Sequence, residues 1–354
     1  MSEISDVTVE NTGESYRCPA DTVLLDAALA AGIHMPHNCR GGACGTCKAK
    51  LVEGSVDPGW AMSFAITDEE KAQGYCLCCQ SKPRSPTIRL QMVNDMQARQ
   101  EGEALIVPAE LTAEIVAAHP VTPSVLRLVV ALPAGMRFRY RAGMNMEFEL
   151  PGIEPARPYS IADAPDAEGA APDGHLTFYV TRHPQGRASG WLHEQARIDG
   201  RLMLRGPYGE FALPAGHEGP VLALAGGTGL SPILSLLGRT LAGGLATPVR
   251  LLFSVREQRE LFACEDLARL ARRHANFTWQ ATLTRDSAAG SWAKGRIPDL
   301  LAREGVNLAG HAVLIAGSQG FVDACAAAAQ AQGAEATAVI VDSFLPRGPV
   351  AGAA

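Results

Sequence analysis

Six of the nine cysteines in this 354-residue chain lie between positions 39 and 79, and this clustering predicts metal chemistry. Cys39, Cys44 and Cys47 follow the spacing C-x4-C-x2-C. That spacing supplies three thiolates to a [2Fe–2S] cluster when a fourth comes from farther along the chain. Three glycines in the same stretch permit the backbone angles and the close approach that such a loop needs.

The fourth thiolate must come from the run GYCLCCQ that begins at Gly74, where Cys76, Cys78 and Cys79 compete. If this run is a strand, Cys79 points to one face and the other two cysteines point to the opposite face. Alternation alone leaves open which face meets the cluster.

A structural zinc site is the rival interpretation, because thiolates also bind Zn²⁺ tetrahedrally. Zinc sites more often use two C-x2-C pairs, so the x4 gap and the glycines favour iron–sulfur. His34 and His37 precede the loop, but the chain has no pair of Cys-x-His motifs of the Rieske kind. We expect them to be surface or packing histidines.

The elements around this loop predict a compact β-grasp unit over residues 5–90. A strand at 7–9 is followed by a helix at 23–30, the metal loop, a strand at 48–52 and the cysteine strand. Residues 94–103 are polar and suit a linker.

Residues 105–216 contain several short strand-like runs with Gly and Pro between them, which predicts a β-barrel. Arg157-Pro158-Tyr159-Ser160 follows a strand and a Pro-rich loop in this region. Arg can clamp a phosphate, Tyr offers a stacking face and Ser a small hydroxyl. Farther on, Gly186–Leu192 reads as a turn leading into a short helix that could present N–H groups to a diphosphate.

From residue 218 onward, apolar strands alternate with helices, which predicts a doubly wound parallel sheet. The first strand runs into Gly226-Gly227-Thr228-Gly229-Leu230-Ser231-Pro232. Glycines at a strand–helix turn make a phosphate cradle at a helix N-terminus. The loop is neither a Walker loop nor G-x-G-x-x-G.

Arg256 and Glu257 follow the second strand of this sheet, where a nucleotide ribose would lie. An Arg there suits a 2′-phosphate, whereas a carboxylate suits the free 2′-hydroxyl of NADH. These two residues leave the coenzyme preference open.

Together, the C-x4-C-x2-C, R-x-Y-S, G-R-A-S and G-G-T-G-L-S-P motifs, in this order, resemble the reductases of bacterial multicomponent oxygenases. In that family a plant-type [2Fe–2S] ferredoxin domain is fused to a ferredoxin–NADP⁺ reductase-like module. The resemblance implies a β-grasp ferredoxin domain at 1–95, an antiparallel β-barrel FAD domain at 105–216 and a doubly wound α/β NAD(P) domain at 217–354.

The resemblance also implies roles for single residues. It makes Cys79 the fourth cluster ligand, beside Cys39, Cys44 and Cys47, and gives Ser160 and Thr228 catalytic positions. The residues that it implies for FAD and nucleotide binding are Arg157, Pro158, Tyr159, Ser160, Val180, Gly186, Arg187, Ala188, Ser189, Gly227, Thr228, Gly229, Arg256 and Phe344. One departure is Ala316, where the family usually has Cys.

The function implied is electron transfer from NADH, with NADPH left open, through FAD and a [2Fe–2S] cluster to a terminal oxygenase that hydroxylates aromatic compounds. The partner would be a Rieske or di-iron oxygenase or a separate ferredoxin. A reductase feeding a deoxysugar dehydratase is one alternative. A non-catalytic redox sensor or electron carrier is the other.

Charge and composition exclude several other classes. The net charge is −6, and the first 95 residues hold 8 Lys and Arg against 12 Asp and Glu, with no basic stripe of the kind that binds nucleic acid. No apolar run approaches the roughly 18 residues of a membrane span, and no secretory signal is visible. We expect a soluble, cytoplasmic monomer with no membrane or nucleic-acid partner.

Overall fold

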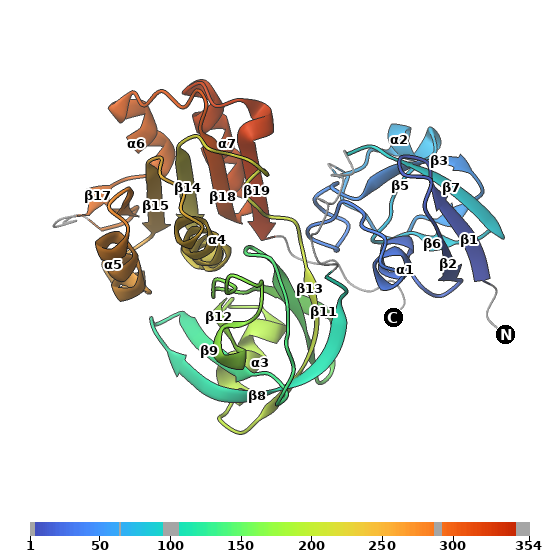
Figure 1. Ribbon diagram of the computed structural model, residues 1–354, viewed down its shortest axis with the longest axis horizontal. Coiled ribbons are helices and arrows are strands. Elements are labelled where there is room, and N and C mark those ends of the chain that lie inside the picture. The colour runs from blue at the N-terminus through green and yellow to red at the C-terminus, as the bar shows by residue number, and fades with distance from the viewer. Residues whose placement is uncertain (1–3, 64, 95–105, 287–291, 345–354) are drawn as a thin grey trace. The chain divides into compact units, whose positions relative to one another are not determined.

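The computed structural model describes residues 4–63, 65–94, 106–286 and 292–344 (Figure 1). The chain divides into two compact units. In its described part, unit 1 contains the chain up to Ala109 together with the short segment Arg205–Glu210, and unit 2 contains Glu110–Leu204 and Phe211–Phe344. The predicted linker, apart from Asn94, lies outside the described residues.

Unit 1 is a five-stranded mixed sheet in the order β2-β1-β7-β3-β5, with β1 and β7 parallel. A two-stranded ribbon, β4-β6, accompanies it. Leu24, Leu25 and Leu29 of helix α1 are buried in its core, as the apolar face of a packed helix requires. This is the predicted β-grasp. Its elements are β1 (Ile4–Val9), β2 (Ser15–Pro19), α1 (Leu24–Ala30), β3 (Lys48–Glu53), β4 (Val56–Asp57), α2 (Asp68–Ala72), β5 (Tyr75–Leu77), β6 (Lys82–Pro83) and β7 (Thr87–Met92).

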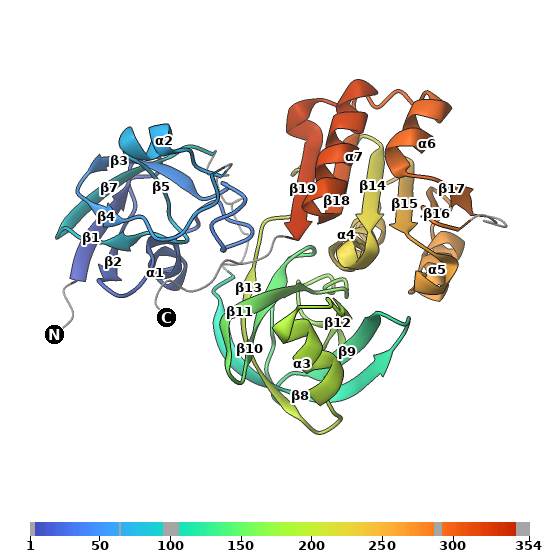
Figure 2. The same cartoon turned by 180° about the vertical axis from the view of Figure 1, so that it is seen from behind.

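The first half of unit 2 is a six-stranded sheet in the order β11-β10-β13-β8-β9-β12, in which the pairs β10–β11, β8–β9 and β9–β12 are antiparallel. The sheet curls, with helix α3 beside it (Figure 2), which confirms the predicted barrel-type domain. Its elements are β8 (Ala109–Pro120), β9 (Val125–Ala131), β10 (Asn145–Leu150), β11 (Ile153–Ser160), η1 (Pro172–Gly174), β12 (His175–Thr181), α3 (Arg187–Gln195) and β13 (Arg201–Tyr208).

The second half of unit 2 is a six-stranded parallel sheet in the order β17-β16-β15-β14-β18-β19. Its central strand β14 is buried on both faces: Ala223 and Ala225 belong to one apolar cluster, and Leu222 and Leu224 to another. The predicted doubly wound fold is confirmed. Its elements are β14 (Val221–Gly226), η2 (Gly227–Gly229), α4 (Leu230–Ala242), β15 (Val249–Val255), η3 (Gln258–Glu260), α5 (Cys264–Arg273), β16 (Phe277–Leu283), β17 (Ala293–Lys294), α6 (Ile297–Glu304), β18 (Ala312–Ser318), α7 (Gln319–Ala331), η4 (Ala336–Ala338) and β19 (Val339–Phe344).

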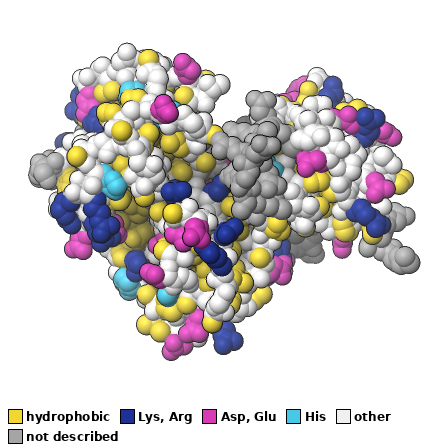
Figure 3. Space-filling view, in the orientation of Figure 1, with side chains coloured by type: hydrophobic (Ala, Val, Ile, Leu, Met, Phe, Trp, Pro, Cys, Tyr) yellow, Lys and Arg dark blue, Asp and Glu magenta, His cyan; other side chains and the backbone are white. Residues whose placement is uncertain are grey.

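Charged side chains and the length of the helices describe the surface and the secondary structure further. Acidic and basic side chains both occur across each unit on the face shown in Figure 3. Within the described ranges, none of the helices combines the length and the apolar character that crossing a bilayer would take.

Candidate functional site

The four predicted cluster ligands lie in unit 1 as two hydrogen-bonded pairs of thiols. Cys39 and Cys44 share one hydrogen bond, which lowers the pKa of the Cys44 thiol to about 5. Cys47 and Cys79 share the other, which lowers the pKa of Cys79 below its usual range. A [2Fe–2S] cluster has two irons and four thiolate ligands. Two pairs of thiols, each with one member that loses its proton readily, fit that requirement.

Backbone N–H groups also point at the sulfur atoms. The Sγ atom of Cys39 accepts hydrogen bonds from the N–H groups of Gly41, Ala43 and Cys44 at 3.4, 3.4 and 3.3 Å. The N–H group of Cys79 donates to Sγ of Cys47 at 3.4 Å. Such donors stabilise thiolate charge and tune the potential of a bound cluster.

Glycine is required at two positions of this loop. Gly42 has φ of +73°, and a Cβ atom there would lie 2.6 Å from the carbonyl oxygen of Trp60. Gly45 has φ of +74°, and its Cβ would lie 3.2 Å from the carbonyl oxygen of Ala65. The loop therefore combines left-handed backbone with close contact to the segment that covers it.

Cys76 and Cys78, the other two candidates for the fourth ligand, contact each other. Strand β5 ends at Leu77, so Cys78 and Cys79 lie in a turn, and the expected alternation of faces along one strand does not extend to them. Cys76 and Cys78 are buried and hydrogen bond to each other. The geometry thus groups Cys79, of the three candidates, with the loop thiols.

The two histidines that precede the loop lie beside a carboxylate. His34 and His37 contact Glu210, whose Oε1 atom is 3.0 Å from His34 Nε2. His37 is buried, so it is not a surface residue.

The predicted flavin residues lie in unit 2 at the end of strand β11. Arg157, Pro158, Tyr159 and Ser160 belong to the strand itself, which follows β10 and the turn at Pro151 and pairs with β10. The Tyr159 ring packs against Phe148, with ring centroids 4.7 Å apart. Strand pairing fixes the direction in which these side chains leave the sheet.

Helix α3 begins at Arg187, and Gly186 caps it without a side-chain hydrogen bond. The Ser189 hydroxyl accepts from the N–H of His183 at 3.1 Å, which holds the turn before the helix. The N–H groups of a first helical turn have no partner within the helix and can bind an anion, so the predicted diphosphate site at this turn stays a prediction.

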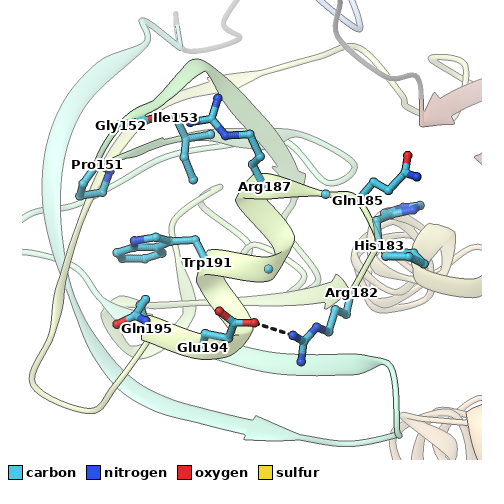
Figure 4. A pocket seen from close by; sticks show the side chains of 13 residues that line it. Pro151, Gly152, Ile153, Arg182, His183, Gln185, Arg187, Trp191, Glu194 and Gln195 are labelled. Atoms are coloured by element: carbon cyan, nitrogen blue, oxygen red, sulfur yellow. Dashed lines mark hydrogen bonds and ion pairs between the residues drawn. The ribbon is translucent and has the colours of Figure 1, made fainter.

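A cavity of about 570 Å³ opens beside α3. Figure 4 shows the Trp191 ring and the Arg187 side chain along it, with Gly152 and Ile153 from the start of β11 at its rim. An ion pair joins Arg182 to a glutamate of α3. Ile153, which lines the cavity, lies four residues before Arg157 on the same strand, β11.

The nucleotide loop follows β14 as a short 3₁₀ turn, and helix α4 starts at Leu230, directly after it. Gly227 has φ of +54°. A Cβ atom on Gly229 would lie 2.1 Å from the carbonyl oxygen of Ala316, on the neighbouring strand β18. Glycine at this position lets the helix begin directly against the sheet.

One hydroxyl pair links the nucleotide loop to the flavin sheet. Oγ1 of Thr228 lies 3.0 Å from Oγ1 of Thr181, the residue after Val180 at the end of β12. In addition, the Ser235 hydroxyl of α4 donates to the carbonyl oxygen of Asp163, shortly after Ser160. Two of the predicted cofactor elements are thereby brought together within unit 2.

The structure shows an ion pair that the sequence analysis missed at the end of β15. Glu260 accepts from the backbone N–H of Arg256 at 2.9 Å and from its Nε at 3.2 Å, and it also pairs with its Nη2. This pairing lowers the pKa of Glu260 even though its burial acts to raise it. The spacing of four residues could have indicated the pair.

Phe344, one of the residues that the resemblance implied for cofactor binding, is the last residue of β19. It is 38% exposed and lies opposite Ser318 of β18.

Three protein-family models match the chain in the order of these elements. They are the 2Fe-2S iron-sulfur cluster binding domain over residues 7–84, the oxidoreductase FAD-binding domain over 112–213 and the oxidoreductase NAD-binding domain over 223–327. The chain is 30% identical to the reductase component of propane 2-monooxygenase from Gordonia sp., over 97% of this chain and 98% of that protein. It is 32% identical to the reductase component of phenol 2-monooxygenase from Pseudomonas sp., over 83% of this chain and 80% of that protein.

The chain belongs to the family of oxygenase reductase components. Two solved structures agree with this. The Amycolatopsis reductase GcoB superposes with a TM-score of 0.86 at 27% identity, over 97% of this chain and 100% of that one. The ferredoxin reductase in carbazole 1,9a-dioxygenase gives 0.76 at 25% identity, over 98% and 99%. This oxygenase reductase component is thus an oxidoreductase with [2Fe–2S], FAD and NAD domains.

Proposed function

We propose that this chain takes electrons from NADH and delivers them singly to the terminal oxygenase of a multicomponent hydrocarbon or aromatic oxygenase, of Rieske or di-iron type, or to a ferredoxin that serves it. When bound, FAD and the cluster supply the division of a two-electron hydride into single electrons. The contact between Thr228 and Thr181 carries this proposal, because the nicotinamide must meet the flavin where these two elements adjoin. Relatives that serve oxygenases of propane, phenol and naphthalene support the substrate class.

The roles of the chain's own residues follow from their positions. Arg157 and the first turn of α3 would hold the FAD diphosphate, and Tyr159 and Ser160 would lie against the isoalloxazine ring. The loop at Thr228 would orient the nicotinamide nucleotide. Cys39, Cys44, Cys47 and Cys79 would bind the cluster.

The cavity beside α3 would take the adenosine half of FAD. Moving along β11 from Ser160 through Arg157 to Ile153 leads from the predicted ring site, past the diphosphate site, to this cavity. Trp191 offers a stacking face for adenine, and Arg187 lies at the phosphate end. This supports FAD rather than FMN as the flavin.

The ion pair of Arg256 with Glu260 supports NADH as the coenzyme. A guanidinium already bound by a carboxylate is poorly placed to accept a 2′-phosphate, and Glu260 repels one. A free 2′-hydroxyl adds no charge and can donate to a carboxylate. The ratio of kcat/KM for NADH and NADPH measures this preference.

The proposed setting is the cytoplasm, with the protein acting as a monomer. All nine cysteines are free thiols in the structure, as a reducing compartment favours. Sedimentation of the holoprotein and its fractionation in cells check the two statements.

The deciding experiment pairs the purified holoprotein with candidate partners. NADH should reduce ferricyanide and cytochrome c catalytically, and substrate hydroxylation should require both this chain and a cognate oxygenase. Binding of NADH without turnover would instead support the sensor. Electron delivery to a sugar dehydratase but to none of the oxygenases would support the deoxysugar pathway.

A further inference from the structure

Glu210 is a largely buried carboxylate with no part in the chemistry described so far. Its Oε1 atom lies 3.0 Å from Nε2 of His34 and 3.4 Å from Nδ1 of His37. Burial acts to raise the pKa of Glu210, but its contacts with the two histidines outweigh this effect and lower the pKa to about 2. The carboxylate of Glu210 is therefore ionised, and it lies close to both histidine rings.

Gly209, the residue before Glu210, also contacts His37. The backbone N–H of Gly209 donates to Nε2 of His37 at 3.3 Å, and Nδ1 of that ring donates to the Met35 carbonyl oxygen at 2.7 Å. Both ring nitrogens of this buried histidine are thus engaged, which fixes the orientation of the ring. We call residues 34–40, which end at the cluster loop, the leading segment.

Tyr208 holds the end of the leading segment. Its ring is 4% exposed and packs in the apolar core of unit 1. The guanidinium carbon of Arg40 lies 3.4 Å from the centroid of this ring, and Asp26 pairs with Arg40 at 2.6 Å. Arg40 has φ of +48°, an unfavourable conformation for a residue with a side chain, so these contacts hold a strained residue in place.

These contacts bracket a predicted ligand. Cys39 lies between His37 and Arg40, and its sulfur accepts three backbone N–H groups of the loop that follows. Tyr208 ends β13, and Gly209 and Glu210 follow it, so the leading segment is held by residues about 170 positions away in the sequence.

We propose that Glu210 is a positioning residue for the iron–sulfur centre: with Tyr208, it anchors the leading segment so that Cys39 stays in place as a ligand. This inference rests on the proposed role of Cys39. It concerns how firmly the loop keeps its cluster and not whether a cluster is present.

The test uses the full-length holoprotein with Glu210→Ala, Glu210→Gln and the matched control Glu218→Ala, an exposed carboxylate eight positions farther on. Cluster loss is followed by the fading of visible absorbance in a chelator, and hydrogen exchange is measured on residues 34–44. Glu210→Ala removes the carboxylate that lies 3.0 and 3.4 Å from the two histidine rings, so we expect cluster loss roughly tenfold faster in this variant. Exchange should rise in the leading segment, and Glu210→Gln should fall between Glu210→Ala and wild type. Glu218→Ala should match wild type.

Unchanged cluster loss and exchange in Glu210→Ala would overturn the inference while leaving the proposed function standing. A wild-type protein without cluster absorbance or an electron paramagnetic resonance signal would instead remove the role of Cys39. If Glu210→Ala fails to fold, Glu210→Gln and His34→Ala decide, because the first keeps the shape of the side chain while removing its charge and the second removes only the contact with His34. Wild-type rates in both would then contradict the proposal.

Discussion

The cluster loop of unit 1 and the nucleotide loop of unit 2 are both rich in glycine, but their glycines serve different chemistry. In the cluster loop, the reactive groups are side chains, and Gly42 turns the backbone toward the sulfur atoms. In the nucleotide loop, the binding groups are the backbone itself, and Gly229 lets a helix start against a neighbouring strand. A site made of side chains is specified by residue types, whereas a site made of backbone is specified by the space around it.

The side-chain site should fail completely when one ligand is lost. Cys79→Ser removes a thiolate, and we expect the visible and electron paramagnetic resonance signals of the cluster to disappear while NADH still reduces ferricyanide through the flavin. Cys78→Ser is the matched control and should keep its cluster. An intact cluster in Cys79→Ser would move the ligand to Cys76 or Cys78.

The backbone site should fail through a single added methyl group. Gly229→Ala would place Cβ 2.1 Å from the Ala316 carbonyl oxygen, so the loop must shift. The strain predicts that kcat/KM for NADH falls by roughly ten- to a hundredfold. Stopped-flow reduction of the flavin measures it. Gly320→Ala, which meets open space in helix α7, should behave as wild type. Normal flavin reduction in Gly229→Ala would show that the close approach is dispensable.

A smaller effect tests the charge beside the nucleotide loop. Glu260→Gln releases Arg256 from its ion pair and removes a negative charge, so kcat/KM for NADPH should rise by about tenfold relative to NADH. Glu304→Gln is the control, because Glu304 forms an ion pair at 2.6 Å with Arg250, at the other end of β15. An unchanged ratio of the two coenzymes in Glu260→Gln would mean that Arg256 does not meet the ribose.

The smallest effect concerns the adenosine half of the flavin. Trp191→Ala should weaken binding of FAD to the apoprotein by several-fold to about tenfold and leave binding of FMN unchanged, because only FAD carries adenine. Fluorescence titration with each flavin measures it. Equal weakening for both flavins would place the adenosine elsewhere.

The same contrast explains what the sequence could predict. The alternation of strands and helices after residue 218 is a local pattern, and the parallel sheet that it predicted is confirmed. The C-x4-C-x2-C spacing is local too, and the [2Fe–2S] domain that it predicted is confirmed by the matching family model. The turn after β5 was missed. The prediction from alternating faces assumed that the strand continues through Cys79, but β5 ends at Leu77 and the chain turns at Cys78. The role of His37 could not be read either, because its partners Gly209 and Glu210 come from β13 and the residues after it.

The segment Arg205–Glu210 limits how this protein can be cut and recombined. It continues the strand that begins in unit 2, yet its residues pack into unit 1, where Tyr208 joins the apolar core. A fragment ending at residue 95 would lack that ring and the carboxylate of Glu210. Engineers who graft this iron–sulfur module onto another reductase should therefore carry the Tyr208–Glu210 tripeptide with it, or redesign the surface that the tripeptide covers.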